Sequence, residues 1–208
     1  MVKRNLPSHA AREIAPSLNE CIFPAATHPH VAAADIEAPS ILPRSAFTAA
    51  APSAVMAPMA HIERLTIHHS GFPQVWTSED HTVTAAHLEF IRKFHTDAPP
   101  AGRGWADIGY HFAVDRAGRA WQARSLQHQG AHVRNHNQHN AGIVVLGNFD
   151  LQPPTPRQVQ ALAGLVAYLR SIYAIAKMEI WTHRELADEP TSCPGEALMA
   201  EIRTLRGF

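Results

Sequence analysis

A histidine and a cysteine in the C-terminal part of the chain have the residue types and the spacing of a metal site. His183 and Cys193 lie ten residues apart within residues 181–195, and the cysteine is followed by Pro194 and Gly195. Imidazole nitrogen and thiolate sulfur are ligands that suit Zn2+. A catalytic zinc site needs three protein ligands and one open position, so we expect a third ligand elsewhere in the chain.

Two adjacent histidines, His68 and His69, end a short apolar segment. Residues 64–69 have β-branched side chains at their centre, which predicts a buried strand. Neighbours on a strand point to opposite faces, so only one of these histidines can face a given site. An isolated pair would be interpreted as one core and one surface residue. The His/Cys segment further along the chain favours His68 as the third ligand.

A second group of histidines offers an alternative metal site. Its members are spaced four, four and three residues apart: His128, His132, His136 and His139. On a helix they would share one face. Residues that oppose a helix interrupt the segment: Gly130, Asn135, Asn137 and Asn140. We therefore favour a loop whose histidines line a cleft.

The segments that must position these residues alternate between strand and helix patterns. We expect strands at residues 64–69, 110–114, 120–123, 142–146 and 178–181, and helices at 77–96, 156–173 and 196–205. The first helix is expected to bury Val83, Ala86, Leu88, Ile91 and Phe94. Thr155 and Gln158 form a capping box around Pro156, which predicts the start of the second helix. No strict βαβ repeat is present, so the pattern predicts an α/β domain with a mixed central sheet flanked by helices.

Length and charge limit the classes of function. A chain of 208 residues is long enough for one catalytic domain. Basic and acidic residues number 18 each, so the chain lacks the electrostatic footprint of a protein that binds nucleic acid or an anionic membrane. It has no apolar run of about 18 residues, which excludes a transmembrane helix. The N-terminus lacks the apolar core of a secretory signal, so we expect synthesis in the cytoplasm.

Residues 1–60 differ in composition and in apolar pattern from the rest of the chain. They are rich in alanine and proline and have no sustained period. Short apolar pieces around Ile22 and around Ile41 could dock on a domain but could not build one. We interpret residues 1–60 as an N-terminal extension that packs partly on the core and otherwise links, and residues 61–208 as the domain. Cys21 lies in the extension, and two cysteines cannot form a disulfide framework.

Four sequence motifs occur in an order that resembles a known family. They are I-H-H-S (67–70), G-W-A-D-I-G-Y-H-F (104–112), G-A-H (130–132) followed by G-I-V-V-L-G-N-F (142–149), and T-H-R-E…T-S-C-P-G (182–195). From residue 62 onward the chain resembles the zinc-dependent N-acetylmuramoyl-L-alanine amidases of the phage-lysozyme and peptidoglycan-recognition-protein superfamily.

The resemblance implies a set of site residues. It implies one zinc ion per chain, held by His68, His183 and Cys193. It also implies that Tyr110 lies near the metal and that Thr191 assists catalysis, by positioning water or stabilising the oxyanion. The segment between His183 and Cys193 is longer than is usual in the family.

Four further residues are candidates for contact with the substrate. The resemblance places His132 at the rim of the substrate groove. Trp105 is expected in the groove wall, and Asn140 and Arg124 are expected to contact the glycan or the peptide stem. For loop residues of these types, the ordinary role is to satisfy backbone groups.

The implied reaction is hydrolysis of the amide bond between N-acetylmuramic acid and L-alanine in peptidoglycan or muropeptides, in the cell wall or in soluble form. The alternative is a module of the same fold that binds peptidoglycan without cutting it. Non-catalytic members that lack zinc typically lose the cysteine ligand, and Cys193 is present, so we expect an enzyme. Glu185 and Glu189 are close in sequence to the ligands, but carboxylates of this kind are normally surface residues.

Overall fold

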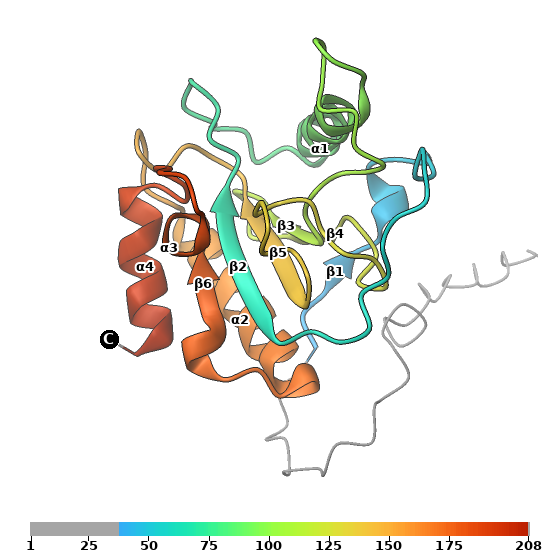
Figure 1. The fold of residues 1–208 in the computed structure, drawn as a ribbon. Coiled ribbons are helices and arrows are strands. Elements are labelled where there is room, and N and C mark those ends of the chain that lie inside the picture. The colour runs from blue at the N-terminus through green and yellow to red at the C-terminus, as the bar shows by residue number, and fades with distance from the viewer. Residues whose placement is uncertain (1–37, 208) are drawn as a thin grey trace, which may run out of the picture.

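Six short strands form one mixed sheet in the computed structural model, which describes residues 38–207. They are β1 Ile41–Leu42, β2 Arg64–His69, β3 Phe112–Val114, β4 Ala120–Gln122, β5 Asn140–Val145 and β6 Ile180–Thr182. Their order across the sheet is β1-β4-β3-β5-β2-β6 (Figure 1). The β3–β4 pair is antiparallel and the other neighbouring strands are parallel. The expected mixed central sheet is confirmed.

The two longest helices, α1 His81–Thr96 and α2 Pro156–Tyr173, begin at residues whose side chains cap them. The other helices are α3 His183–Leu186 and α4 Glu196–Arg206, with 3-10 turns η2 Arg44–Ala46 and η3 Lys177–Glu179. Asp80 caps α1 by accepting a hydrogen bond from the backbone N–H of Val83. Thr155 and Gln158 form the expected capping box of α2, with Pro156 at its first position.

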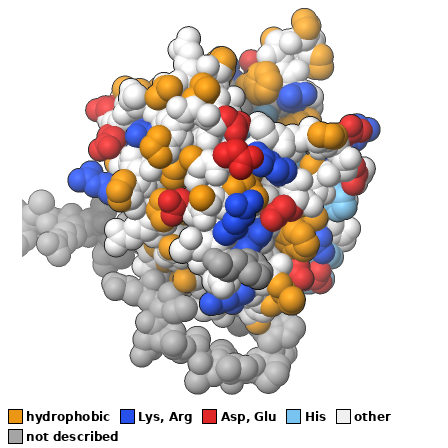
Figure 2. Space-filling view, turned by 90° about the vertical axis from the view of Figure 1, so that its left-hand side faces the viewer, with side chains coloured by type: hydrophobic (Ala, Val, Ile, Leu, Met, Phe, Trp, Pro, Cys, Tyr) orange, Lys and Arg blue, Asp and Glu red, His pale blue; other side chains and the backbone are white. Residues whose placement is uncertain are grey.

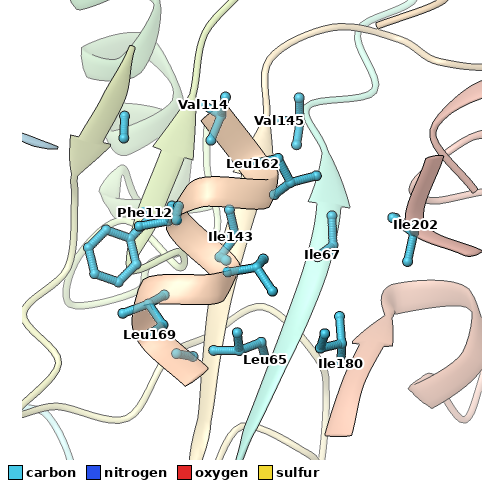
Figure 3. Packing of buried hydrophobic residues seen from close by; sticks show 14 of the residues in the cluster. Leu65, Ile67, Phe112, Val114, Ile143, Val145, Leu162, Leu169, Ile180 and Ile202 are labelled. Atoms are coloured by element: carbon cyan, nitrogen blue, oxygen red, sulfur yellow. The ribbon is translucent and has the colours of Figure 1, made fainter. Parts of the chain in front are cut away.

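The larger core lies between the sheet and helices α2 and α4. Alternate residues of β2 and β5 point toward α2, among them Ile67 and Ile143 (Figure 3). Leu162 and Leu169 of α2 pack against them, and Ile202 of α4 completes the cluster. Every residue of β5 is buried, as expected for a central parallel strand covered on both faces.

Helix α1 covers the opposite face of the sheet, but with a different apolar stripe from the one expected. Its buried residues are Thr84, Leu88, Ile91 and His95. Three residues that were expected to be buried are exposed: Val83 (45%), Phe94 (42%) and Ala86. Two polar residues can occupy the buried stripe because both are hydrogen-bonded: the Thr84 hydroxyl donates to the Asp80 carbonyl, and His95 Nδ1 accepts from the Gly109 N–H.

Residues 38–60 lie along the β4 edge of the sheet. Strand β1 pairs in parallel with β4. The Arg44 guanidinium lies 2.8 Å from the buried carboxylate of Asp107 and also donates to the Ala123 carbonyl. Met59 is buried in the larger core. Cys21 and the apolar piece around Ile22 lie outside the described residues.

Charge is dispersed over the surface. On the face shown in Figure 2, basic and acidic side chains are interspersed, in keeping with the zero net charge. None of the helices found in residues 38–207 is both long and apolar enough to span a membrane.

Candidate metal centre

Three side chains from distant parts of the chain converge at one end of the sheet. One donor atom each of His68, His183 and Cys193 lies within 4.8 Å of the other two. His68 Nδ1 is 3.7 Å from Cys193 Sγ, although the two residues are 125 positions apart in sequence. The ring centroids of His68 and His183 are 4.7 Å apart.

Strand register explains why the two histidines meet. Strands β2 and β6 are parallel neighbours, with Ile67 opposite Thr182. His68 and His183 follow these paired residues directly, so both lie at the carboxyl ends of the strands. Ligands bind preferentially at this end of a parallel sheet. Thr182 also caps the short helix α3, whose first residue is His183, through hydrogen bonds with Glu185.

The loop that carries Cys193 is fixed by backbone hydrogen bonds. Its Sγ accepts a hydrogen bond of 3.4 Å from the His69 N–H. The Cys193 N–H donates to Thr191 Oγ1 at 3.2 Å, and its carbonyl accepts from the Arg184 N–H at 2.8 Å. Arg184 also donates through its guanidinium to the Ser192 carbonyl. The sulfur is therefore held in position beside His68.

A chain of hydrogen bonds assigns the tautomer of His68. His132 Nε2 lies 3.1 Å from the backbone carbonyl of Asn140, which can only accept, so Nε2 carries the proton. His132 Nδ1 is then an acceptor, and His68 Nε2, 3.0 Å away, donates to it. This leaves the lone pair of His68 Nδ1 free, on the side that faces Cys193. Metal-ligating histidines are normally oriented by such a second hydrogen bond.

The imidazoles are neutral near pH 7. Burial, followed by the nearby His132 and His183, lowers the pKa of His68 well below its usual value. Burial also lowers the pKa of His183 and, more strongly, that of His132. Burial raises the pKa of the Cys193 thiol to about 12. A cation that binds here must therefore displace the thiol proton, as metals do at cysteine ligands.

The donor set and its spacing fit zinc. In a tetrahedral site, a thiolate sulfur and an imidazole nitrogen that share one zinc ion lie about 3.6 Å apart. The separation of 3.7 Å between His68 Nδ1 and Cys193 Sγ matches this value. Imidazole and thiolate are both zinc ligands, and three protein ligands with a fourth position open are characteristic of catalytic zinc sites.

The expected catalytic helpers lie beside the triad. The Tyr110 ring centroid is 5.2 Å from that of His68. Burial, with a smaller effect of Cys193, raises the pKa of the Tyr110 hydroxyl, so it remains a hydrogen-bond donor at neutral pH. Thr191 accepts from the Cys193 N–H, which leaves its own proton free to donate. Trp105 is half-buried and its ring centroid is 4.7 Å from that of His95, which in turn lies 5.6 Å from the Tyr110 ring.

His132 does not lie at the rim of a groove, as was expected. It is buried, and both of its ring nitrogens are engaged by His68 and Asn140. Its side chain packs against Gly130 and Gly142, where an added Cβ would approach the imidazole within 2.6 Å. His132 therefore supports a candidate ligand from behind, a role that the sequence alone does not reveal.

Arg124 and Asn140 are also placed differently from expectation. The Arg124 guanidinium is buried and donates to the backbone carbonyls of Ile108, Gln129 and Asp107. The Asn140 amide accepts from Thr66 Oγ1 and donates to the His136 carbonyl. Both side chains satisfy groups within the protein and are not free to contact a substrate.

The histidine-rich segment is a loop, as favoured above, and its four histidines do not form one metal site. Asn135 and His139 have positive φ angles of 65° and 58°, which no helix contains. His136 Nε2 instead lies 2.9 Å from Oδ1 of Asp188, and the Asn135 amide donates to Oδ2 of the same carboxylate. Asp188 thus connects the long segment between His183 and Cys193 to this loop, a contact that no sequence signal indicated.

Glu185 has a structural role. Its carboxylate accepts two hydrogen bonds from the Arg206 guanidinium and two from Thr182. The hydrogen bond from Arg206 is the main cause that lowers the pKa of Glu185 to about 2. A carboxylate this acidic and this fully engaged is a poor general base.

Comparison with known proteins identifies the family of the chain. Residues 58–196 match the family described as N-acetylmuramoyl-L-alanine amidase. A pig protein named N-acetylmuramoyl-L-alanine amidase is 30% identical over 82% of this chain and 28% of its own length. Drosophila melanogaster peptidoglycan-recognition protein LB is 30% identical over 81% of this chain and 69% of its own. This chain spans about a quarter of the length of the pig relative and of its human counterpart.

Solved structures share the fold. Drosophila peptidoglycan-recognition protein LB has a TM-score of 0.68 and 30% identity, covering 79% of this chain and 93% of that one. Peptidoglycan recognition protein LE, solved in complex with tracheal cytotoxin, a monomeric diaminopimelic acid-type peptidoglycan, has a TM-score of 0.69 and 26% identity. That match covers 79% of this chain and 92% of the other.

Proposed function

The chain belongs to the N-acetylmuramoyl-L-alanine amidase family, and on this basis we propose that it is a zinc-dependent hydrolase. The bond cleaved is the amide between N-acetylmuramic acid and L-alanine, in peptidoglycan or in soluble muropeptides. The observation that carries the proposal is the convergence of His68, His183 and Cys193, whose donor atoms lie within 4.8 Å of one another. The set of ligands leaves room for substrate or water at a fourth position.

Each residue has a distinct task in this proposal. His68, His183 and Cys193 hold the zinc ion, which when bound supplies a Lewis acid able to activate water and polarise a carbonyl. Tyr110 remains protonated because burial raises its pKa, so it can donate a hydrogen bond to the oxygen on which negative charge develops. Thr191 orients the Cys193 loop through its oxygen and can donate its proton toward the substrate.

The relatives support a muropeptide as the ligand class. The structure of peptidoglycan recognition protein LE contains a monomeric peptidoglycan fragment. Other relatives are named as amidases or, as in phage K11, as an endolysin. The same fold therefore serves both recognition and enzyme roles among these proteins, and the intact His/His/Cys triad favours the enzyme here.

Cys193→Ser tests the enzyme proposal. The serine hydroxyl stays protonated at neutral pH and is a weak ligand, so zinc content should fall. Release of stem peptides from purified sacculi should drop at least about a hundredfold, the scale expected when an electrostatic catalyst is lost. Muropeptide binding should persist, because the substitution leaves the walls around Tyr110 and Trp105 in place.

The neighbouring Ser192→Ala is the matched control, since Ser192 is exposed and contributes its backbone carbonyl to Arg184. It should retain zinc and activity. Unchanged cleavage by the Cys193 variant would contradict the role of this residue as a ligand. If neither variant nor parent cuts but all bind muropeptide, the chain is a recognition module.

A further inference from the structure

A second group of metal-ligating side chains lies at the opposite end of the same strands. Nitrogen atoms of His61 and His139 and a carboxylate oxygen of Glu63 are within 4.8 Å of one another. These residues precede β2 and β5, whereas His68 lies near the carboxyl end of β2 and His183 directly follows β6. At about 3.3 Å per residue, the distance along β2 from His61 to His68 is on the order of 20 Å. The two clusters are therefore separate sites.

Strand geometry brings the three side chains together. His61 and Glu63 are two positions apart in an extended segment, so they share one face, while Ile62 between them is buried in the core. The parallel register pairs Arg64 with Asn140, which sets His139 beside Glu63. The Glu63 N–H donates to the His139 carbonyl at 2.9 Å and fixes this arrangement.

The imidazoles present suitable donor atoms. His139 Nδ1 lies 3.1 Å from the carbonyl of His61, which can only accept. The proton therefore lies on Nδ1, and His139 Nε2 keeps a free lone pair. His61 Nε2 is 2.7 Å from a carboxylate oxygen of Glu63, and its ring stacks on that of His139 with centroids 3.7 Å apart. A cation bound between His61 and Glu63 would take the place of this hydrogen bond.

Backbone strain is a second observation at the same place. His139 has φ of 58°, in the left-handed region that costs a residue other than glycine roughly 1–2 kcal/mol. The strained residue directly precedes β5, and its ring is the one that stacks on His61. Strained residues of this kind cluster at functional sites, and this one belongs to a group of side chains that could hold a metal ion.

We propose that His61, Glu63 and His139 form a second binding site for a divalent transition-metal cation such as Zn2+. Two imidazoles and one carboxylate are an established zinc ligand set, whereas Ca2+ and Mg2+ prefer sites made of oxygen atoms. All three side chains can be reached from solvent, since His61 and Glu63 are about half exposed and His139 is half-buried. The cation would join the segment before β2 to the histidine-rich loop. This proposal is independent of the amidase activity.

Metal titration of the full chain tests the second site. Chelator-treated protein is titrated with Zn2+ and, in parallel, with Co2+, whose spectrum reports thiolate coordination. The parent should bind two equivalents. His139→Asn should bind one, because asparagine tolerates the left-handed backbone but lacks the imidazole. His61→Gln, at an exposed position, should also bind one equivalent. His81→Gln, on the surface of α1, is the control and should still bind two equivalents.

The first site provides the internal comparison. With Co2+, Cys193→Ser should lose the equivalent bound at the first site, which is recognised by its thiolate-to-cobalt charge-transfer band. It should keep the equivalent bound at the second site. Excess Ca2+ should not displace the second equivalent. The proposal is overturned if His139→Asn and His61→Gln bind as much metal as the parent, whether the parent binds one equivalent or two. Failure of the Cys193 site would leave the effect of these two substitutions unchanged, so the proposals are tested separately.

Discussion

The hydrogen bond from His68 to His132 determines which nitrogen of His68 can bind a metal. His132 makes no hydrogen bond to the Cys193 thiol or to His183. Its hydrogen bond to the Asn140 carbonyl nevertheless determines which nitrogens of the His132 and His68 rings carry protons. The orientation of His68 thus depends on the backbone at the start of β5. Supporting groups of this kind commonly affect metal affinity by about 10–100-fold.

Substituting His132 should weaken zinc binding without removing a ligand. His132→Phe keeps the ring volume but has no acceptor for His68 Nε2, and we expect zinc affinity to fall about 10–100-fold in competition with a chromogenic chelator. His132→Asn retains an acceptor near the position of Nδ1 and should recover part of the affinity. Equal affinity of the phenylalanine variant and the parent would show that His132 has no positioning role.

At the scale of residues, the sequence pointed to the three side chains that converge, His68, His183 and Cys193, but not to the residues that position them. The types and spacing of His183 and Cys193 indicate a metal site, and the motifs indicate His68 as the third member. The roles of His132, Arg124 and Asn140 could not be predicted. Each depends on which backbone carbonyl or side chain lies within hydrogen-bonding distance of the side chain in the folded protein. Polar residues of these types occur equally in substrate grooves and in buried networks.

At the scale of elements, helix α4 must start immediately after the cysteine loop, and Gly195 makes this possible. Gly195 has φ of 87°, and a Cβ atom at this position would lie 2.5 Å from the backbone carbon of Phe149. The N–H of Ala197, in the first turn of α4, donates to the Phe149 carbonyl. The position of the cysteine loop therefore depends on close contact between two backbone segments.

Gly195→Ala should destabilise the fold and the metal centre together. Strain at positive φ and the clash with the backbone should lower the free energy of unfolding by about 2–4 kcal/mol, measured by urea denaturation. Gly164→Ala on α2 is the matched control, because nothing lies within 4 Å of its added methyl group. That substitution should stabilise the protein by about 0.5–1 kcal/mol. Equal effects at the two glycines would contradict this account.

Element boundaries were predictable where local chemistry sets them. The capping box at Thr155 gave the start of α2. The buried stripe of α1 was mispredicted because tertiary contacts favour Thr84 and His95 over the more apolar Val83 and Phe94. The periodicity of apolar residues does not predict that His95 will be buried by accepting a hydrogen bond from the Gly109 N–H.

At the scale of the whole molecule, buried neutral histidines make stability depend on pH. Burial lowers the pKa of His95 and of His111 to about 4. His111 Nδ1 accepts from the Gly142 N–H and its Nε2 donates to the His128 carbonyl, an arrangement that requires the neutral ring. In the unfolded chain the same side chains titrate near their ordinary pKa of about 6.5.

The chain should therefore lose stability in mild acid. Between the unfolded pKa of about 6.5 and the folded value of about 4, the unfolded state binds more protons, so stability is full above this window and falls as pH decreases through it. Urea denaturation in chelator at about pH 7.5 and about pH 5 should reveal the loss. His111→Gln can satisfy both backbone partners without titrating and should reduce the slope by about one proton. An unchanged slope would contradict the assignment.

The overall architecture followed from the order of the elements, whereas the placement of residues 38–60 did not. A mixed sheet was predicted from strands and helices that alternate without a strict repeat. The pairing of β1 with β4 rests on two residues, Ile41 and Leu42, in a segment with no sustained period. The ion pair of Arg44 with Asp107 joins residues 63 positions apart, a distance at which sequence patterns carry no information.

The 125-residue separation of His68 and Cys193 has a consequence for how the molecule assembles. Closing a loop of that length costs conformational entropy, which only the folded sheet repays. A cation held by both residues acts as a removable cross-link between an early strand and a late loop. During synthesis, a nascent chain that has not yet reached residue 193 has at most the two histidines of the triad. In the proposed zinc enzyme, high-affinity metal binding would therefore begin only once the sheet and its last loop have come together.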